Sequence, residues 1–263
     1  MLINNFNNLE QFLEFEPGTY YKFVALVRAK DFKSGNHTPV LNINERGEIF
    51  VRQWFVDSKE ALEKYELDMI NLCTVTKARL YVTTDRKSTT KTILAMQDQL
   101  NGYVRQLISN PNAPVSIRKL SKFSASASQL AECSSGPKYW LIDIDGNGLD
   151  ESIQYRVMVG LCDYFKHIFF PKKVIANTTP NGFHLLVRRN FDIVSHINDF
   201  LGGKDIKCSI TGAPSKQAEE LIIQSLPEYA NNAREWIKKY RDNWTLKENA
   251  LTLVYMNFDD TII

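Results

Sequence analysis

The sequence predicts an α+β protein in which a central antiparallel or mixed sheet is flanked by helices. Three observations support this fold class. Apolar and polar residues alternate between Tyr20 and Val56, two long helical repeats of apolar residues follow, and an apolar run at 138–145 ends in two carboxylates. The 263 residues suffice for a substantial hydrophobic core. We expect a smaller α/β part at 1–120, a Ser-rich connection at 121–137 and a second half at 138–263 that carries most of the sheet, either as separate parts or as one continuous domain.

The first half is expected to form two strands, a helix, a strand and a second helix. Apolar residues of one parity from Tyr21 to Val27, and again from Ile49 to Val56, predict two antiparallel strands. Asp57 is followed three residues later by Glu60, which predicts a capping box and a helix that runs to about Asn71. A strand at 78–82 and a helix with an apolar stripe at 93–107 complete this half.

The second half is expected to alternate strands and helices. The run at 138–145 predicts a buried strand that reaches a polar edge, and a helix should follow from about Glu151 until Pro171 stops it. Two strands joined by a hairpin come next, because Asn181 and Gly182 form a hairpin signal. These two strands are expected at 174–176 and 183–187. Helical stretches around 221–222 and 236–240 and a last strand at 251–256 complete the half.

Composition narrows the class of protein and its location. Thirty-two Lys and Arg against thirty Asp and Glu give a net charge of +2, so nucleic-acid binding would need local basic patches. The four cysteines form no CxxC pair, which argues against a zinc ribbon, a redox motif and a disulfide framework. No signal peptide and no apolar run of about 18 residues is visible, so we expect a cytoplasmic protein without a membrane span.

Asp143 and Asp145 are the first candidates for chemistry. Residues two apart on a strand project from one face, so both carboxylates can contact one Mg²⁺ or Mn²⁺ ion. A solvated turn after a strand is the simplest alternative, and 143–148 also matches the first half of a calcium loop, although Gln154 stands where the last ligand should be. The segment further resembles the start of haloacid-dehalogenase-like phosphohydrolases, with Asp143 as nucleophile and Asp145 as general acid.

His184 is the second candidate. It follows the turn at Thr179–Gly182 and lies on a strand, 39 residues after Asp145. A lone histidine is more often structural than functional. Its position after a strand with two aspartates, a helix and a glycine turn favours a shared site.

In order and spacing these segments resemble the archaeo-eukaryotic primase superfamily, and the N-terminal half looks most like small primase-like proteins of phages. Leu141–Asp145 resembles its hydrophobic strand motif ending in DxD, and Gly182-Phe183-His184 resembles its GxH motif. The segment Lys247–Thr252 is similar to its third pattern of an acid, two variable residues, an aliphatic residue and Thr, which makes Glu248 the candidate acid. Asp205 is the rival, and the family usually has Ser where this chain has Asn181.

The resemblance implies a metal-dependent nucleotidyltransferase that synthesises or extends primers from nucleoside triphosphates on a single-stranded DNA template. Asp143, Asp145 and Glu248 would hold Mg²⁺ or Mn²⁺, and His184 and Asn181 would contact the nucleotide. A replication helicase or another replisome protein is a possible partner, and the location would be the host cytoplasm if the source is viral. The alternatives are an inactive primase-like protein that binds nucleic acid or nucleotide, and the phosphohydrolase.

Basic residues could guide a template strand by contacting its phosphates. One group lies near the end of the first-half strand, a second flanks the second-half strands, and a third is mixed with aromatic residues near the C-terminus. The groups are Arg79, Arg86, Lys87 and Lys91; Lys172, Lys173, Arg188 and Arg189; and Trp236, Lys238, Lys239, Tyr240, Arg241 and Trp244. Ordinary solvated charge on strand ends is the alternative for the first two groups. In the third, the aromatic residues could stack on bases or, at helical spacing, pack in the core with the cations facing solvent.

Overall fold

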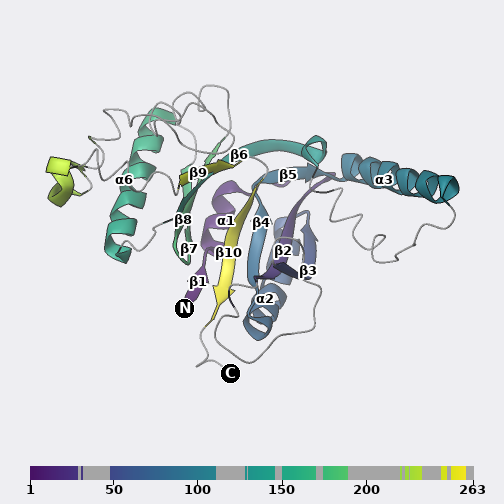
Figure 1. Ribbon diagram of the computed structural model, residues 1–263, viewed down its shortest axis with the longest axis horizontal. Coiled ribbons are helices and arrows are strands. Elements are labelled where there is room, and N and C mark those ends of the chain that lie inside the picture. The colour runs from purple at the N-terminus through teal and green to yellow at the C-terminus, as the bar shows by residue number, and fades with distance from the viewer. Residues whose placement is uncertain are drawn as a thin grey trace.

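A computed structural model shows an α+β protein built on one large antiparallel sheet, as Figure 1 shows. The α+β class and the antiparallel sheet flanked by helices are therefore confirmed. The structure describes residues 1–28, 31, 48–110, 128, 130–145, 150–169, 174–188, 220, 223–224, 226–232, 244–247 and 250–258. Within these ranges, no helix is long and apolar enough to cross a membrane.

Ten strands and four α-helices make up the described fold. The strands are β1 (Leu2–Asn4), β2 (Thr19–Arg28), β3 (Glu48–Val56), β4 (Arg79–Thr83), β5 (Asp85–Ser88), β6 (Ser134–Asp145), β7 (Val174–Thr179), β8 (Gly182–Arg188), β9 (Trp244–Lys247) and β10 (Leu251–Asn257). The α-helices are α1 (Phe6–Phe12), α2 (Lys59–Thr76), α3 (Thr89–Ser109) and α6 (Glu151–Phe169). Two short 3₁₀ helices, η2 (Ala131–Cys133) and η3 (Pro227–Asn232), complete the described elements.

The sheet is nearly closed on itself. Its strand order is β1-β10-β4-β2-β5-β6-β8-β7, with β3 beside β2 and β9 beside β6, and every described pairing is antiparallel. The side chain of Asn5 joins the two ends, because its Nδ2 donates to the carbonyls of Thr178 in β7 (3.0 Å) and Leu253 in β10 (3.1 Å). The Asn5 Oδ1 accepts from the Thr178 amide at 3.1 Å. These bonds hold β7 beside β10.

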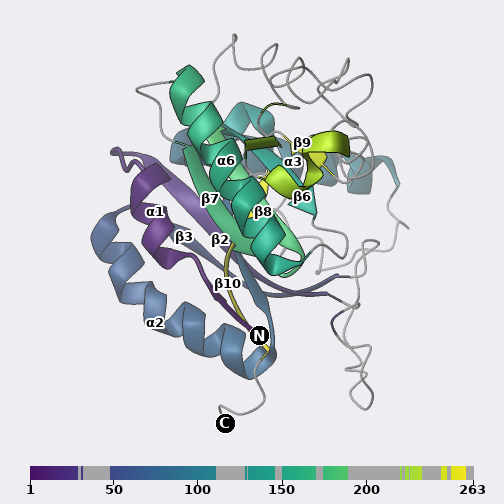
Figure 2. The same ribbon diagram turned by 90° about the vertical axis from the view of Figure 1, so that its left-hand side faces the viewer.

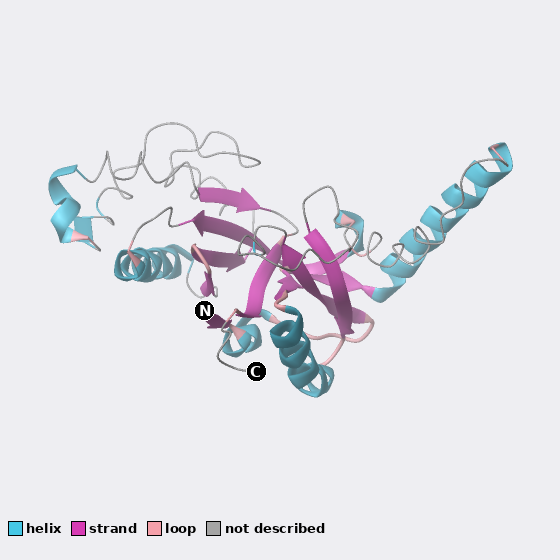
Figure 3. Ribbon diagram, turned by 60° about the horizontal axis from the view of Figure 1, so that its bottom comes forward, coloured by secondary structure: helices cyan, strands magenta, loops and turns pink. Residues whose placement is uncertain are grey.

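The strand β2 separates the hydrophobic core from the opposite, concave face of the sheet. Its odd-numbered residues, such as Tyr21 and Phe23, pack with α1, α2 and β3 in the main core. Figures 2 and 3 show α1 and α2 on this same side of the strands. The even-numbered residues of β2, from Lys22 to Arg28, therefore face the other way.

The start and end of α2 differ slightly from the predicted helix. Ser58 rather than Asp57 is the N-cap, because its hydroxyl accepts from the Ala61 amide at 3.1 Å. The helix continues to Thr76, where Lys77 adopts a left-handed conformation with φ 52° and ends it. The predicted strands at 20–56, 78–82, 138–145, 174–187 and 251–256 correspond to β2 and β3, β4, β6, β7 and β8, and β10.

The expectation of a sheet built mostly from the second half was wrong, because both halves contribute strands to one sheet. The last strand, β10, lies between β1 and β4, and β5 pairs with β6. Four elements were not predicted, β1, α1, β5 and β9, because they are short or carry polar residues without clear periodicity. Residues 134–137 of the expected Ser-rich connection form the start of β6, while 111–127 lie outside the described residues.

The helix predicted from the apolar stripe at 93–107 is confirmed as α3, but its apolar side chains are mostly exposed. Among them, Ile93 is 58% exposed, Leu100 42% and Ile108 74%. Buried contacts of α3 lie near its start, where Ala95 packs with Cys133 of η2. Figure 1 shows the helix projecting from the sheet.

Candidate functional site

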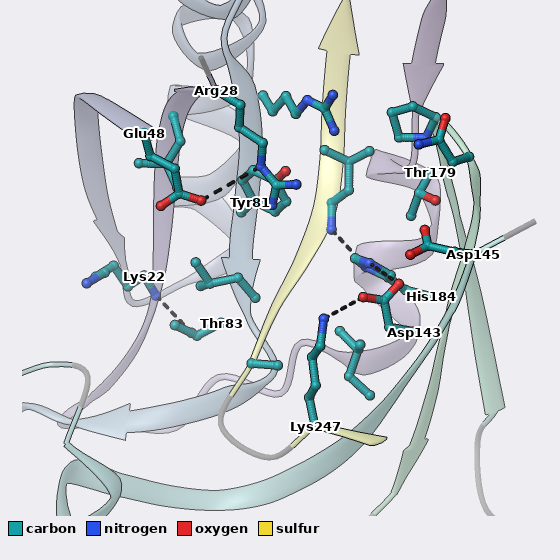
Figure 4. A pocket seen from close by; sticks show the side chains of 18 of the residues that line it. Lys22, Arg28, Glu48, Tyr81, Thr83, Asp143, Asp145, Thr179, His184 and Lys247 are labelled. Atoms are coloured by element: carbon teal, nitrogen blue, oxygen red, sulfur yellow. Dashed lines mark hydrogen bonds and ion pairs between the residues drawn. The ribbon is translucent and has the colours of Figure 1, made fainter. Parts of the chain in front are cut away.

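A cavity of about 620 Å³ lies on the concave face of the sheet. It is bordered by β2 and β4 on one side and by β6, β8 and β9 on the other, and β10 runs between them (Figure 4). Asp143, Asp145 and His184 line it, together with Asn181 of the hairpin turn. The structure therefore brings together the four candidate residues that it describes.

The pairing of β6 with β8 places both aspartates. Asp143 and Asp145 lie two residues apart on β6 and project from the same face. In the antiparallel register Asp143 is opposite His184, and Asp145 is opposite Gly182. A directly opposed pair shares a face of the sheet, so the histidine faces the same cavity as both carboxylates, as Figure 4 shows.

The orientation of His184 is fixed by a chain of hydrogen bonds. Its Nδ1 accepts from the backbone amide of Leu253 (3.4 Å) and lies 3.1 Å from the Thr252 hydroxyl. A backbone amide can only donate, so the proton of the neutral ring is on Nε2, which lies 3.4 Å from Asp143 Oδ1. The Thr252 hydroxyl accepts from Asn177 Nδ2 at 2.9 Å and can donate to the ring.

The N-terminal helix extends this chain. Asn8 Nδ2 donates to Asn177 Oδ1 at 3.0 Å, and Asn177 and Thr252 are fully buried. The polar chain thus runs from α1 through β7 and β10 to His184 and Asp143. Because Asn177, Thr252 and His184 are buried and every member of the chain is bonded, the imidazole is held toward the carboxylate.

Asp143 is an ionised, partly buried carboxylate. Burial by itself would raise its pKa, but hydrogen bonding and charge interaction with His184 and with Lys247 outweigh it and lower the pKa to about 2. The Nζ of Lys247, on the adjacent β9, donates to Oδ2, while His184 lies against Oδ1. Asp145 is exposed at the end of the strand. Both oxygens of Asp143 are therefore engaged by this chain's own side chains.

The hairpin between β7 and β8 sets the rim of the cavity. Thr179 pairs with Gly182, so Pro180 and Asn181 form the two-residue turn, one position earlier than the predicted Asn-Gly turn. All of Thr179, Pro180 and Asn181 line the cavity, and Asn181 is exposed. Its amide is therefore available to a ligand at the rim.

Several sequence-based candidates lie outside the described residues. These are Glu248, its rival Asp205, and the calcium-loop residues at 146–149. Lys247 and Ala250, which flank Glu248 and Asn249 in the sequence, both line the cavity. Across the described ranges, no group of three or more His, Cys, Asp or Glu side chains is placed to hold a metal ion. The donors that the structure does describe, two carboxylates on one strand face, are the oxygen ligands that suit Mg²⁺ or Mn²⁺.

Most of the predicted basic patch around β4 and β5 is buried and engaged in the fold. Arg79 forms two hydrogen bonds with Asp31 (2.9 and 2.6 Å), and Lys87 pairs with Asp85 at 2.7 Å. Arg86 donates to backbone carbonyls of β6 and the segment after α1. Each of these cations has a partner within the fold, and Arg79 and Lys87 also line the cavity, so contact with a template stays a prediction.

Other predicted cations remain partly open to solvent or lie outside the described residues. Lys91 is exposed on α3, and Arg188 at the end of β8 lies 3.6 Å from Glu14. Residues 172–173, 189 and 236–241 lie outside the described ranges, as does the side chain of Trp244.

The topology around β6 bears on the phosphohydrolase alternative. That alternative needs Asp143 at the carboxyl edge of a parallel, doubly wound sheet. β6 instead pairs antiparallel with β5, β8 and β9. The described sheet therefore does not support a haloacid-dehalogenase-like site.

Four residues of the site were not singled out from the sequence. Lys22 and Arg28 on β2 and Lys247 on β9 line the cavity, and the buried Asn177 on β7 supports His184 through Thr252. A lysine at a central position of an otherwise apolar strand is the one sequence signal that could have identified Lys22. The other three depend on strand register, which the sequence pattern does not specify.

Searches with protein-family models, among curated proteins and among solved structures return no match.

Proposed function

We propose that the chain is a metal-dependent nucleotidyltransferase of the primase/polymerase type, which synthesises or extends primers on a nucleic-acid template. One observation supports it most: Asp143 and Asp145 share a strand face with His184, which the adjacent hairpin presents to the same cavity. Both sequence motifs on which the resemblance to the archaeo-eukaryotic primase superfamily rests are thereby brought into one site. The large antiparallel sheet agrees with the sheet that such a fold requires.

Each described residue has a role that follows from its position. The two aspartates would hold Mg²⁺ or Mn²⁺, with Glu248 as the proposed third acid and Asp205 as its rival. When bound, the metal would polarise the attacked phosphate and neutralise the charge on the departing pyrophosphate. The Nε2–H of His184 lies against Asp143 Oδ1, and once a metal ion took that oxygen the same N–H could donate to a phosphate oxygen. Asn181 at the rim can donate through its amide.

A second candidate function is supported by the contact between Lys247 and Asp143. A lysine ammonium on the carboxylate neutralises the charge that a metal ion would neutralise. In an inactive primase-like protein, this ion pair would be permanent and the cavity would bind nucleic acid or nucleotide without catalysis. In an active enzyme, Lys247 would have to leave Asp143 when the metal binds.

Gel-resolved incubation with labelled nucleoside triphosphates tests the proposal. Reactions contain single-stranded DNA, with and without a primer, and Mg²⁺ or Mn²⁺. The variants are the double change Asp143→Asn with Asp145→Asn, and Asp98→Asn on the exposed face of α3 as a matched control. Metal-dependent products from the wild type and the control, but not from the double variant, are expected. If the wild type forms no product yet binds DNA or nucleotide, the inactive binding protein is the better account.

A further inference from the structure

The wall of the cavity opposite the aspartates is formed by β2 and β4. Lys22 and Arg28 lie at two ends of the β2 face that lines the cavity, and we call this pair the β2 wall. Between them the surface is apolar, because Val24 and Leu26 pack with Tyr81 and Leu253. Figure 4 shows Lys22 and Arg28 on one side of β10, with Asp143 and Asp145 on the other.

The cations around the cavity differ in how firmly this chain already pairs them. Arg79 and Lys87 each hold a carboxylate within 3 Å, so each pair adds little net charge. The guanidinium of Arg28 is held more loosely. Its Nε is 3.8 Å from Glu48 Oε1, beyond hydrogen-bond distance, and its side chain is 32% exposed.

Arg28 also stacks on an aromatic ring. Its guanidinium carbon lies 5.3 Å from the centre of the Tyr81 ring. This contact fixes the plane of the guanidinium while leaving N–H groups for a ligand, and Glu48 is a carboxylate with which a bound anion would compete. A planar, pre-oriented guanidinium is well suited to phosphate oxygens.

Lys22 is a second cation of the wall, buried at 2% exposure. Its Nζ donates to the Ser128 hydroxyl at 2.9 Å. Burial and, to a smaller extent, the charge of Lys87 lower its pKa to about 8. A buried cation whose charge is disfavoured by its surroundings, and which lines a cavity, is a feature that functional sites share.

We propose that the β2 wall binds phosphate groups of the substrate, so that the cavity holds its ligand between a carboxylate wall and a cationic wall. This inference rests on the proposed function, which requires both a nucleic-acid strand and a nucleoside triphosphate. The two share the phosphate chemistry that Arg28 and Lys22 recognise. Binding measurements without a metal separate them from each other and from catalysis.

The test is fluorescence anisotropy of a labelled thymidine oligonucleotide of about 12 nucleotides, within the usual size of single-strand sites. The buffer contains a chelator that removes metal ions, and the salt concentration is varied. Arg28→Gln is expected to weaken binding about fivefold at low salt and to reduce the salt slope by about 0.7, the value for one phosphate contact on a single strand. The double variant with Lys22→Met should lose more.

Arg52→Gln is the matched control. Arg52 also stacks on an aromatic ring, at 5.0 Å from Trp54, and pairs with Asp68 at 3.1 Å, but it lies on β3 outside the cavity. It should bind the oligonucleotide as the wild type does. A parallel arm measures displacement of a fluorescent nucleoside triphosphate. If the wall variants lose affinity only for the nucleoside triphosphate, the β2 wall binds the triphosphate. If they lose affinity only for the oligonucleotide, it binds the nucleic-acid strand.

Unchanged affinity for both ligands in Arg28→Gln and in the double variant would overturn the inference. Its failure can be told apart from failure of the proposed function. If the wild type makes primer products and the wall variants bind normally, only the inference fails. If the wild type makes no product but the wall variants lose binding, the nucleotidyltransferase proposal fails and the phosphate site stands.

Discussion

Replacing Lys22 by methionine should stabilise the protein at neutral pH and reveal the energetic cost of its buried charge. Methionine keeps a long apolar chain but removes the ammonium, so it preserves most of the packing. The pKa of Lys22 is lowered from 10.5 to about 8, mainly by burial. Each pKa unit corresponds to about 1.4 kcal/mol, so the charge costs roughly 3 kcal/mol of folding free energy at pH 7.

The sign of the pH dependence follows from this depressed pKa. Below about pH 8 the lysine is protonated in both the folded and the unfolded chain, and the full cost applies. Between about pH 8 and 10.5 the unfolded chain binds more protons, so the wild type becomes more stable as the pH rises. Most of this roughly 3 kcal/mol should be recovered between pH 7 and pH 10.

Urea unfolding of the wild type and Lys22→Met from pH 6 to pH 10 measures this difference. Loss of the hydrogen bond to Ser128 offsets about 1 kcal/mol, so the variant should be more stable by about 2 kcal/mol at pH 7. The advantage should vanish or reverse by pH 10. Lys64→Met, which removes an exposed cation of α2, is the control and should show no such trend. A variant that is less stable at pH 7 and whose difference does not change with pH would refute the reasoning.

Two further substitutions test how the site is held. Thr252→Val removes the hydroxyl between Asn177 and His184 and should lower stability by about 1–3 kcal/mol in urea unfolding. It should also reduce nucleotide incorporation at least about tenfold, as loss of a supporting contact commonly does; full activity would show that the hydroxyl does not position the ring. Asn5→Ala removes three hydrogen bonds between α1, β7 and β10 and should cost about 2–3 kcal/mol. Unchanged unfolding of that variant would contradict its role in closing the sheet.

Local patterns predicted the strands and helices that have strong periodicity. The alternation in β2 and β3, the apolar run of β6 and the stripe of α6 were each sufficient to place the element. The short β1, β5 and β9 were missed because three or four residues carry too little periodicity. Their partners are set by long-range register, as for β10 between β1 and β4, which a single sequence does not encode locally.

The candidate site was predicted only in part, because local motifs identify residues but not the strand register that brings them together. Two motifs identified Asp143, Asp145 and His184, but not that Asp143 is directly opposite His184. The partners of Arg79 and Lys87 inside the fold were not predicted, because a sequence pattern does not show which cations pair with a carboxylate. Arg28 was not predicted, because nothing in the sequence shows that its partner is held loosely. Its importance lies in a loose ion pair and an aromatic contact, both formed across strands.

Binding of Mn²⁺ is the most direct test that Asp143 and Asp145 form a metal-dependent site. The signal of free Mn²⁺ in electron paramagnetic resonance reports binding without relying on activity. The wild type and Asp98→Asn are compared with Asp143→Asn and Asp145→Asn, with and without a nucleoside triphosphate. We predict that the wild type and the control bind Mn²⁺ and that each site variant binds it at least about tenfold more weakly. Equal binding by the wild type and both site variants would contradict the assignment of the metal to these two carboxylates.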